Sequence, residues 1–323
     1  MVQLGKFERY LIEEFFDDYR AGEMTHRTFT RRVAFIMGSM AAASAAMLLV
    51  GCTPEEVPRS TDPMPTPSGS TTGTATASTG PVPGAKSPLS VPEGAAGLTT
   101  ATVRLAAGGT DISGYLARPD SGGAGPAVLV CHENRGLTPH IQDVARRFAK
   151  AGYTALALDL LSREGGTASL DSDAVSGALT KAGAARHVGD FAAAFDYLQA
   201  QDFVESGRIA MNGYCFGGGI TWQAATELPG LKATAAFYGP APDLNKVPAI
   251  KAAAFGVYAE LDQRITGAMP ALRDALAATT VTHQLTVYPG VDHAFHNDTG
   301  ERYNEARATA AWNDTLSWFG QHV

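Results

Sequence analysis

Cysteine and charged residues are both scarce in this sequence. Its 323 residues include three cysteines, and only 18% are Asp, Glu, Lys or Arg. An odd number of cysteines cannot close into a complete disulfide framework. No two of them have the spacing of zinc ligands, so we expect no metal site. Cys52, Cys131 and Cys215 therefore need separate explanations.

Basic residues are outnumbered, and the usual nucleotide-binding motifs are missing. The 25 Lys and Arg residues against 32 Asp and Glu give a formal net charge of −7. Without a basic stripe to neutralise phosphates, the chain is not expected to bind nucleic acid. It has no G-x-x-x-x-G-K-[ST] loop and no G-x-G-x-x-G run after its first strand, so no cofactor is expected.

An apolar segment lies near the N-terminus. Residues 33–50 are eighteen uncharged, largely apolar residues, preceded by Arg31 and Arg32. A basic region, an apolar core and small residues before a cleavage point are typical of an export signal. The paired arginines resemble those of a twin-arginine signal. A segment of eighteen residues is also at the short end of a membrane span, so a single uncleaved transmembrane helix is the alternative.

The end of this segment resembles a lipobox. In that signal the cysteine is lipidated and the chain is cut before it, and here the run is Leu49-Val50-Gly51-Cys52. The resemblance predicts an exported lipoprotein that is anchored to the cell membrane through Cys52. A diacylated cysteine gives firm attachment, whereas a single chain holds only weakly.

Composition divides the chain into three parts. Residues 1–52 hold the signal and an N-terminal extension, whose run FERYLIEEFFDDY is expected to form a short helix. Residues 53–94 are rich in Pro, Ser, Thr and Gly with almost no large apolar side chains, which predicts a flexible tether. Residues 95–323 are expected to form one folded domain.

Strand-like and helix-like runs alternate through this domain. Continuous apolar runs of five to seven residues indicate buried strands, and longer periodic runs indicate helices. The alternation predicts an α/β fold, with a mostly parallel sheet covered by helices on both faces. The expected strands are residues 102–106, 114–118, 126–132, 154–159, 208–212, 232–238, 252–258 and 284–288, and the expected helices are 141–151, 174–199, 220–227, 269–278 and 301–319.

The clearest chemical motif follows the expected strand at 208–212. There the sequence reads Gly213-Tyr214-Cys215-Phe216-Gly217-Gly218-Gly219, directly before a helix. This is the G-x-S-x-G pattern of a nucleophile elbow, with cysteine in place of serine. The helix N-terminus that follows favours the thiolate. We therefore expect Cys215 to be a nucleophile, the alternative being a buried structural cysteine.

A thiolate nucleophile needs a base, and the base needs an orienting acid. In α/β-hydrolases these follow the nucleophile in the order acid, then histidine, each after a late strand. Asp262 and His293 fit that order. His296 is a rival base three residues further on.

Four separated motifs resemble the dienelactone hydrolase family. They are Val130-Cys131-His132-Glu133-Asn134-Arg135-Gly136-Leu137, then Gly152-Tyr153 with Ala157-Leu158-Asp159, then GYCFGGG, and then Tyr288-Pro-Gly-Val-Asp-His-Ala-Phe. They occur in the family's order and cover nearly all of the folded domain. The resemblance implies an eight-stranded α/β-hydrolase that cleaves ester or enol-lactone bonds.

The family also suggests roles for individual residues. Its glutamate beside the nucleophile corresponds to Glu133, whose alternative is an ion pair with Arg135. The backbone N–H groups of Asn134 and Phe216 would form an oxyanion hole. Cys131 is expected to be a core strand residue.

One position departs from the family pattern. Members that cleave dienelactone carry an arginine four residues after the catalytic histidine, where this chain has Asn297. Asparagine lacks the charged, bidentate grip of arginine on a carboxylate. Arg135, Tyr214 and Asn297 are the candidate substrate-binding residues. The expected activity is that of a carboxylic ester or lactone hydrolase with a small-molecule substrate, and the alternative is a non-catalytic surface binding protein on a hydrolase scaffold.

Overall fold

The computed structural model describes residues 4–50, 81–120 and 122–323. Contacts divide the chain into two compact units, residues 1–79 and residues 80–323. Cys52 and the first part of the expected tether, residues 53–80, lie outside the described residues. The lipid attachment and that part of the tether therefore remain predictions.

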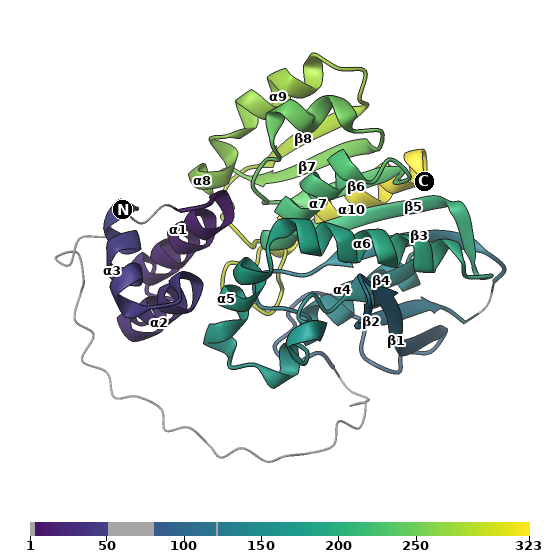
Figure 1. The fold of residues 1–323 in the computed structure, drawn as a ribbon. Coiled ribbons are helices and arrows are strands. Elements are labelled where there is room, and N and C mark those ends of the chain that lie inside the picture. The colour runs from purple at the N-terminus through teal and green to yellow at the C-terminus, as the bar shows by residue number, and fades with distance from the viewer. Residues whose placement is uncertain (1–3, 51–80, 121) are drawn as a thin grey trace. The chain divides into compact units, whose positions relative to one another are not determined.

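In its described residues, 4–50, the N-terminal unit contains three helices (Figure 1), namely α1 (Lys6–Arg20), α2 (His26–Met37) and α3 (Met40–Leu49). The helix expected over FERYLIEEFFDDY is confirmed as α1. Tyr19 of α1 stacks on Phe29 of α2, with ring centroids 5.5 Å apart. Thr25 begins α2 by accepting a hydrogen bond from the backbone of Thr28, a standard N-cap.

The apolar segment at residues 33–50 is divided between two helices. Gly38 ends α2 in the left-handed conformation with φ of 74°, and Ser39 caps α3. Within the described part of the chain, no single helix has both the length and the apolar character needed to cross a membrane. Helices α2 and α3 meet those criteria only as a pair, bent by 103°.

An eight-stranded sheet forms the centre of the second unit, in the order β1-β2-β4-β3-β5-β6-β7-β8. The hairpin β1–β2 is antiparallel, β2 pairs antiparallel with β4, and every other pairing is parallel. The predicted mostly parallel sheet is thereby confirmed. The strands are β1 (Leu98–Ala107), β2 (Thr110–Pro119), β3 (Gly125–Cys131), β4 (Thr154–Leu158), β5 (Val204–Tyr214), β6 (Ala233–Phe237), β7 (Ala253–Ala259) and β8 (His283–Tyr288).

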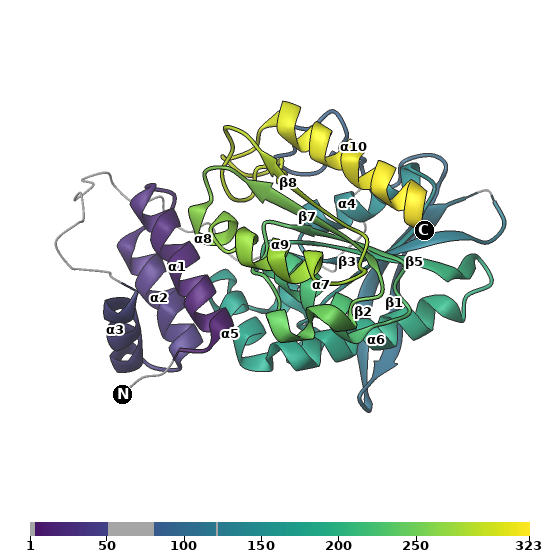
Figure 2. The ribbon, with the colours of Figure 1, turned by 90° about the horizontal axis from the view of Figure 1, so that it is seen from above.

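Helices cover both faces of the sheet, as Figure 2 shows. Helices α4 (Pro139–Lys150) and α10 (Glu305–His322) lie on one face, and α6 (Ala184–Gln199), α7 (Phe216–Glu227) and α9 (Met269–Ala277) lie on the other. Every residue of β4, β6 and β7 is buried, which explains their continuous apolar sequences. The remaining short elements are α5 (Ser172–Ala182), α8 (Gln263–Thr266) and the 3₁₀ turns η1 (Ser162–Glu164), η2 (Thr167–Ser169) and η3 (Leu244–Ala249).

Two expectations about this unit are corrected. The single helix expected over residues 174–199 is two helices, α5 and α6, because Gly183 has φ of 80° and interrupts the helical backbone. The compact unit also begins at residue 80 rather than near Ala95. Although residues 81–94 contain few large apolar side chains, their backbone makes hydrogen bonds to the rest of the unit. For example, the Val91 N–H donates to Asp143 at 2.6 Å.

Glycines allow α7 to begin very close to the ends of β3 and β6. A Cβ atom on Gly217 would lie 2.5 Å from the carbonyl oxygens of both Cys131 and His132. One on Gly218 would lie 2.4 Å from the carbonyl oxygen of Phe237. Any larger residue at either position would push the helix away from the sheet. The run of three glycines thus sets the position of the turn that carries Cys215.

Candidate active site

The candidate catalytic residues all follow strands that end at the same edge of the sheet. Glu133 follows β3, Cys215 follows β5, Asp262 follows β7 and His293 follows β8. In an open parallel sheet the carboxyl ends of the strands form the usual ligand-binding edge. Cys131 pairs with Gly213 in the β3–β5 register, so Glu133 and Cys215 each lie two residues beyond a paired position.

Cys215 occupies the sharp turn between β5 and α7. Its backbone has φ of 57° and ψ of −121°, an uncommon conformation for a residue other than glycine. Its N–H donates to the carbonyl of Phe237 at 3.0 Å, and its own carbonyl accepts from Gly218 at 2.9 Å. Strained backbone of this kind is retained where surrounding contacts enforce it, and it is common at functional sites.

Asp262 and His293 form a close pair. Nδ1 of His293 lies 2.6 Å from Oδ2 of Asp262. The other carboxylate oxygen of Asp262 accepts from the N–H of Ile265 at 3.3 Å, which begins helix α8. The Sγ atom of Cys215 and a ring nitrogen of His293 lie within 4.8 Å of each other. The structure therefore brings together the three residues that sequence order had suggested.

Opposing effects act on the pKa of the Asp262 carboxyl. Burial alone would raise the pKa, but the charge and hydrogen bond of His293, followed by the charge of Arg264, outweigh burial and hold it below its usual value. Nη2 of Arg264 lies 3.9 Å from Oδ1 of Asp262. Sequence reasoning missed Arg264, because a lone arginine two residues after an aspartate carries no motif.

His296 does not have the surroundings of a catalytic base. Its ring is fully buried, 5.0 Å from the Tyr214 ring and 5.2 Å from that of Phe237. Burial, followed by the charges of Arg147 and His140, lowers its pKa well below the usual value, so the ring stays neutral. Between the two candidates, the geometry favours His293.

Glu133 is held by Asn297 rather than by Arg135. Nδ2 of Asn297 donates to Oε2 of Glu133 at 2.7 Å. The orientation of that amide is determined by Thr299, whose N–H and hydroxyl both donate to Oδ1 of Asn297, at 3.1 and 2.7 Å. Arg135 is exposed, and among the described ion pairs there is none between Arg135 and Glu133. Asn297 therefore occupies the place expected for substrate binding while it contacts Glu133.

The loop after β3 is held by residues that sequence reasoning did not single out. Nδ1 of buried His132 lies 2.6 Å from the carbonyl oxygen of Glu133, and its Nε2 accepts from the N–H of Leu160 at 3.4 Å. The Glu133 carbonyl belongs to the same planar peptide unit as the Asn134 N–H, so fixing one fixes the other. Ser176 of α5 donates to the Asn134 carbonyl at 2.9 Å.

Two residues of the motifs belong to the core. Tyr214 is fully buried between His296 and Phe237, which gives it a packing role behind the nucleophile rather than a contact with substrate. Burial raises the pKa of its hydroxyl. Cys131 is a buried, unpaired strand residue, as expected. Burial, followed by the neighbouring Cys215, raises the pKa of the Cys131 thiol well above its usual value, so it is not a reactive thiolate.

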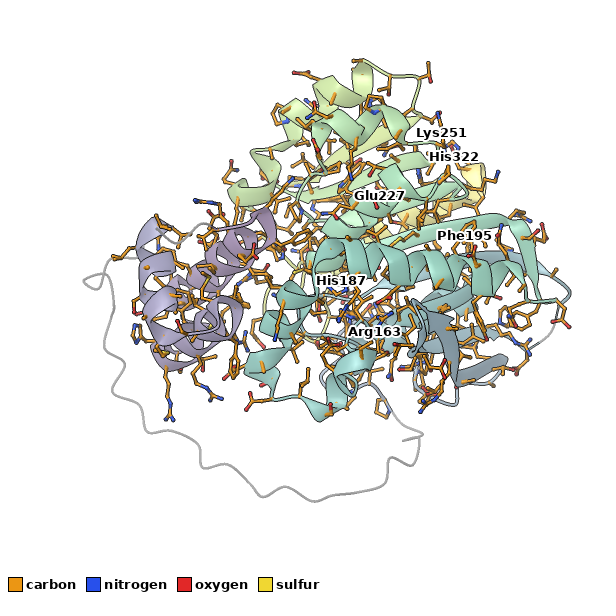
Figure 3. All side chains as sticks on the ribbon, viewed as in Figure 1. Arg163, His187, Phe195, Glu227, Lys251 and His322 are labelled. Carbon is orange, nitrogen blue, oxygen red and sulfur yellow. The ribbon has the colours of Figure 1, made fainter. Side chains whose placement is uncertain are left out.

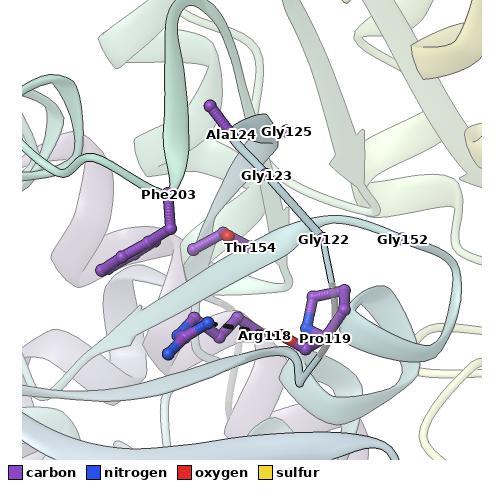
Figure 4. A pocket seen from close by; sticks show the side chains of 9 residues that line it. All are labelled: Arg118, Pro119, Gly122, Gly123, Ala124, Gly125, Gly152, Thr154 and Phe203. Carbon is purple, nitrogen blue, oxygen red and sulfur yellow. Dashed lines mark hydrogen bonds between the residues drawn. The ribbon is translucent and has the colours of Figure 1, made fainter.

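A pocket of about 310 Å³ lies at the other end of the sheet (Figure 4). It adjoins the amino ends of β3 and β4, and Arg118, Thr154 and Phe203 are among its lining residues. None of the catalytic candidates lines it. Since ligands of open α/β sheets bind at the carboxyl ends of strands, this pocket is separate from the candidate active site.

Comparisons with known proteins show what this chain is similar to. A family model described as the dienelactone hydrolase family matches residues 112–323. A Methylorubrum extorquens protein, to which the name carboxymethylenebutenolidase has been assigned, is 33% identical over 239 residues, which cover 70% of this chain and 82% of that protein. A Saccharolobus solfataricus protein with the same assigned name is 31% identical over 247 residues, covering 65% and 94% of the two chains.

Solved structures are similar as well. A crystal structure from Klebsiella pneumoniae, described as that of a dienelactone hydrolase, has a TM-score of 0.65 and 29% identity, covering 70% of this chain and 99% of that one. A dienelactone hydrolase-like promiscuous phosphotriesterase from metagenomic libraries has a TM-score of 0.64 and 24% identity over the same shares. The second likeness is one of fold alone.

Replacing Asp262 with asparagine tests the Asp262–His293 pair through stability. The pKa of the Asp262 carboxyl is lower in the folded protein than in the unfolded chain. The ionised carboxyl therefore adds to the free energy of unfolding at any pH above the unfolded pKa, and this stabilisation is lost as pH falls through the folded pKa. We expect Asp262→Asn to be less stable than the natural protein at pH 6, with the difference shrinking below about pH 4. Urea unfolding between pH 3 and 7 measures this. The matched control is Asp111→Asn at an exposed position near the start of β2, which should follow the natural protein. A difference that grows with acidity would contradict the pairing.

Proposed function

The chain belongs to the dienelactone hydrolase family and is an ester or lactone hydrolase, and we propose that it works through a Cys215–His293–Asp262 triad and an acyl-enzyme. The observation that carries this proposal is the position of Cys215. It lies at positive φ at the end of β5, with a His293 ring nitrogen within 4.8 Å, and His293 is in turn 2.6 Å from Asp262. Acyl transfer requires a nucleophile next to a base, and an acid that orients the base.

In the proposed reaction the Cys215 thiolate attacks the carbonyl carbon of the substrate. Asp262 accepts the hydrogen bond from Nδ1–H of His293, which leaves Nε2 to take the thiol proton and later give it to the leaving alkoxide. Water then attacks the thioester, loses its proton to His293, and releases the acid and the free thiol. The charge of Asp262 stabilises the imidazolium that forms in both halves of the reaction.

Backbone N–H groups of Asn134 and Phe216 are proposed to stabilise the oxyanion. Phe216 is the first residue of α7, where N–H groups and the helix dipole favour negative charge. The Asn134 N–H belongs to the peptide that His132 holds through the Glu133 carbonyl. Donors that are already oriented stabilise a developing charge without reorganisation.

Glu133 is proposed to assist Cys215 in the resting enzyme, as in the family. Its partner Asn297 is informative about the charge of the substrate. The neutral amide donates to one carboxylate oxygen of Glu133 without adding positive charge to the site. A substrate carboxylate at this place would meet Glu133 without a balancing cation. We therefore propose that the preferred esters or lactones are uncharged near Asn297.

The alternative of a non-catalytic binding protein is not favoured. Three features of the site lower the stability of the fold or restrict its sequence, and binding alone requires none of them. They are the glycines that let α7 approach the sheet, the strained backbone of Cys215 and the buried carboxylate beside His293. The relatives named above carry the name of an enzyme.

Export and membrane anchoring are a separate proposal. We propose that the mature protein is held at the extracytoplasmic side of the cell membrane by lipid on Cys52. The paired arginines, the apolar residues 33–50 and the lipobox-like run before Cys52 support this. An enzyme held in this way would meet substrates that arrive from outside the cell.

Replacing Cys215 with alanine tests the nucleophile. We expect Cys215→Ala to lose hydrolysis of small p-nitrophenyl esters by about 10³-fold or more, since loss of the nucleophile removes the covalent route. In the natural protein, iodoacetamide should label Cys215 stoichiometrically and abolish turnover. Mass spectrometry and initial rates measure both effects.

Cys131→Ala is the matched control. It removes a buried thiol from β3, so we expect a loss of about 1–2 kcal/mol in the free energy of unfolding with turnover largely retained. Retained hydrolysis in Cys215→Ala would refute the assignment of the nucleophile. Labelling without hydrolysis of any ester would direct the search to lactones.

Replacing Asn297 with arginine tests the substrate proposal. The new cation should favour esters that carry a carboxylate near the scissile bond, because a hydrogen bond to a charged group contributes about 1.5–3 kcal/mol. We expect the ratio of kcat/KM for a carboxylated ester to that for a neutral ester of equal size to rise about tenfold or more. Asn297→Gln keeps a neutral amide and should leave the ratio unchanged. A natural enzyme that already prefers the carboxylated ester would overturn the proposal.

Replacing Cys52 with serine tests the anchor. The full chain expressed in a bacterial host should partition into the detergent phase of a Triton X-114 separation, and Cys52→Ser should move to the aqueous phase or accumulate uncleaved. Mass spectrometry of the N-terminus measures lipidation directly. Two results together would instead support an uncleaved membrane helix. The natural protein would carry no lipid, and Cys52→Ser would still enter the detergent phase at full length.

A further inference from the structure

Residues 81–94, here called the strap, precede the part of the chain that the family model matches, residues 112–323. No residue of the strap has a role in the proposed reaction. Its backbone nevertheless makes hydrogen bonds to two parts of the second unit. One is helix α4, and the other is the segment from His293 to Gly300, here called the His293 loop.

The strap joins the His293 loop at Asp298. The N–H of Lys86 donates to the carbonyl of Asp298 at 3.1 Å, and the N–H of Ser87 donates to its carboxylate at 3.1 Å. The ammonium of Lys86 also donates to the Gly300 carbonyl at 3.1 Å. Consecutive strap residues thus hold both the backbone and the side chain of one loop residue.

Asp298 is a fixed point because its carboxylate is fully buried and paired. Its carboxylate lies 2.8 Å from Nη2 of Arg147 and 2.9 Å from Nδ1 of His140, both on α4. Burial would raise the pKa of this carboxyl, but the hydrogen bond with His140 and the charge of Arg147 hold it far below the usual value. A buried carboxylate that is paired in this way cannot move without leaving an uncompensated charge.

The other end of the strap is tied to α4 and β2. Arg146 donates from Nε to the Val91 carbonyl at 2.7 Å and from Nη1 to the Glu93 carboxylate at 2.8 Å. Tyr115 of β2 also donates to Glu93. These bonds lie on residues that have no described contact with the His293 loop. Loosening them changes the strap without touching the triad.

The His293 loop carries two groups that the proposed reaction needs. His293 lies five residues before Asp298. Asn297, which donates to Glu133, immediately precedes Asp298. Thr299, on the other side of Asp298, orients the Asn297 amide. A shift of Asp298 would therefore be transmitted in both directions along the loop.

We propose that the strap is a positioning element of the active site. Through Asp298 it holds the His293 loop, so that His293 stays in register with Cys215 and Asn297 stays in register with Glu133. The expected change in kcat rests on the proposed function, whereas the expected change in the mobility of the His293 loop does not. Residues 81–94, which precede the part that the family model matches, are thus part of what keeps the site assembled.

The test compares Arg146→Met with Arg163→Met in the full chain. Arg163, labelled in Figure 3, is a close match for Arg146, because it also binds one carboxylate, Asp190 at 2.7 Å, and one backbone carbonyl, Ala107 at 2.9 Å. It has no described contact with the strap. Both variants lose a bond to a carboxylate and a bond to a backbone carbonyl, and Arg146→Met also loses a hydrogen bond to the Tyr115 hydroxyl at 2.9 Å. Only Arg146→Met loosens the strap.

We expect Arg146→Met to lower kcat about tenfold with KM within twofold, because a small misplacement of reacting groups is costly while binding contacts remain. Amide hydrogen exchange in residues 293–300 should become faster in Arg146→Met and stay unchanged in Arg163→Met. Arg146→Lys, which retains a cation for Glu93, should recover most of the lost rate. Circular dichroism and thermal unfolding confirm that the variants are folded.

Equal losses of kcat in the two arginine variants, or unchanged exchange in the His293 loop of Arg146→Met, would overturn the proposal. If Arg146→Met does not fold, Glu93→Gln, which removes only a charge, takes its place with the same expected pattern. If Cys215→Ala retains hydrolysis, the proposed nucleophile is wrong, but exchange in the His293 loop still decides whether the strap holds it.

Discussion

The close approach of helix α7 to the sheet is the constraint on which the site depends. Gly218 and Gly239 lie so near each other that a Cβ on Gly239 would be 2.2 Å from the Gly218 backbone. With α7 this close to β3 and β6, the chain must turn sharply after β5, and Cys215 takes positive φ to make that turn. The strain of one residue is offset by packing along the whole helix, which is buried over most of its length.

Buried charge supplies the second constraint, and it occurs on both sides of His293. Asp262 is fixed by its helix cap and by its pairing with His293. Asp298 is fixed by Arg147 and His140. Since each carboxylate would be costly to leave unpaired, the loop between β8 and α10 is held at two points. His293 needs such support because it lies in a loop, whereas Cys215 is held directly between a strand and a helix.

Much of this arrangement could be predicted from sequence, because the relevant signals are local. Buried strands appear as apolar runs, the turn at Cys215 has its glycines, and chain order identifies Asp262 and His293. The contacts of residues 81–94 could not be predicted, since their composition is that of a linker and several of the bonds that hold them involve the backbone. The break at Gly183 was missed because glycine between small residues is tolerated in a helix. Ser176 donates to the carbonyl of Asn134, a residue 42 positions earlier in the chain, and a contact at that separation leaves no local pattern.

Asn297 illustrates how one neutral residue can change the demands on a site. A glutamate beside a nucleophilic cysteine brings a negative charge to the site, and the nature of its hydrogen-bond partner decides whether that charge is offset. An arginine would supply charge and would also attract anionic substrates. An amide satisfies one oxygen of Glu133 and, because Thr299 orients it, does so without adding charge. In the mechanism that we propose, Glu133 can therefore assist Cys215 without breaking an ion pair, and the lack of a cation at this place is the basis for proposing uncharged substrates.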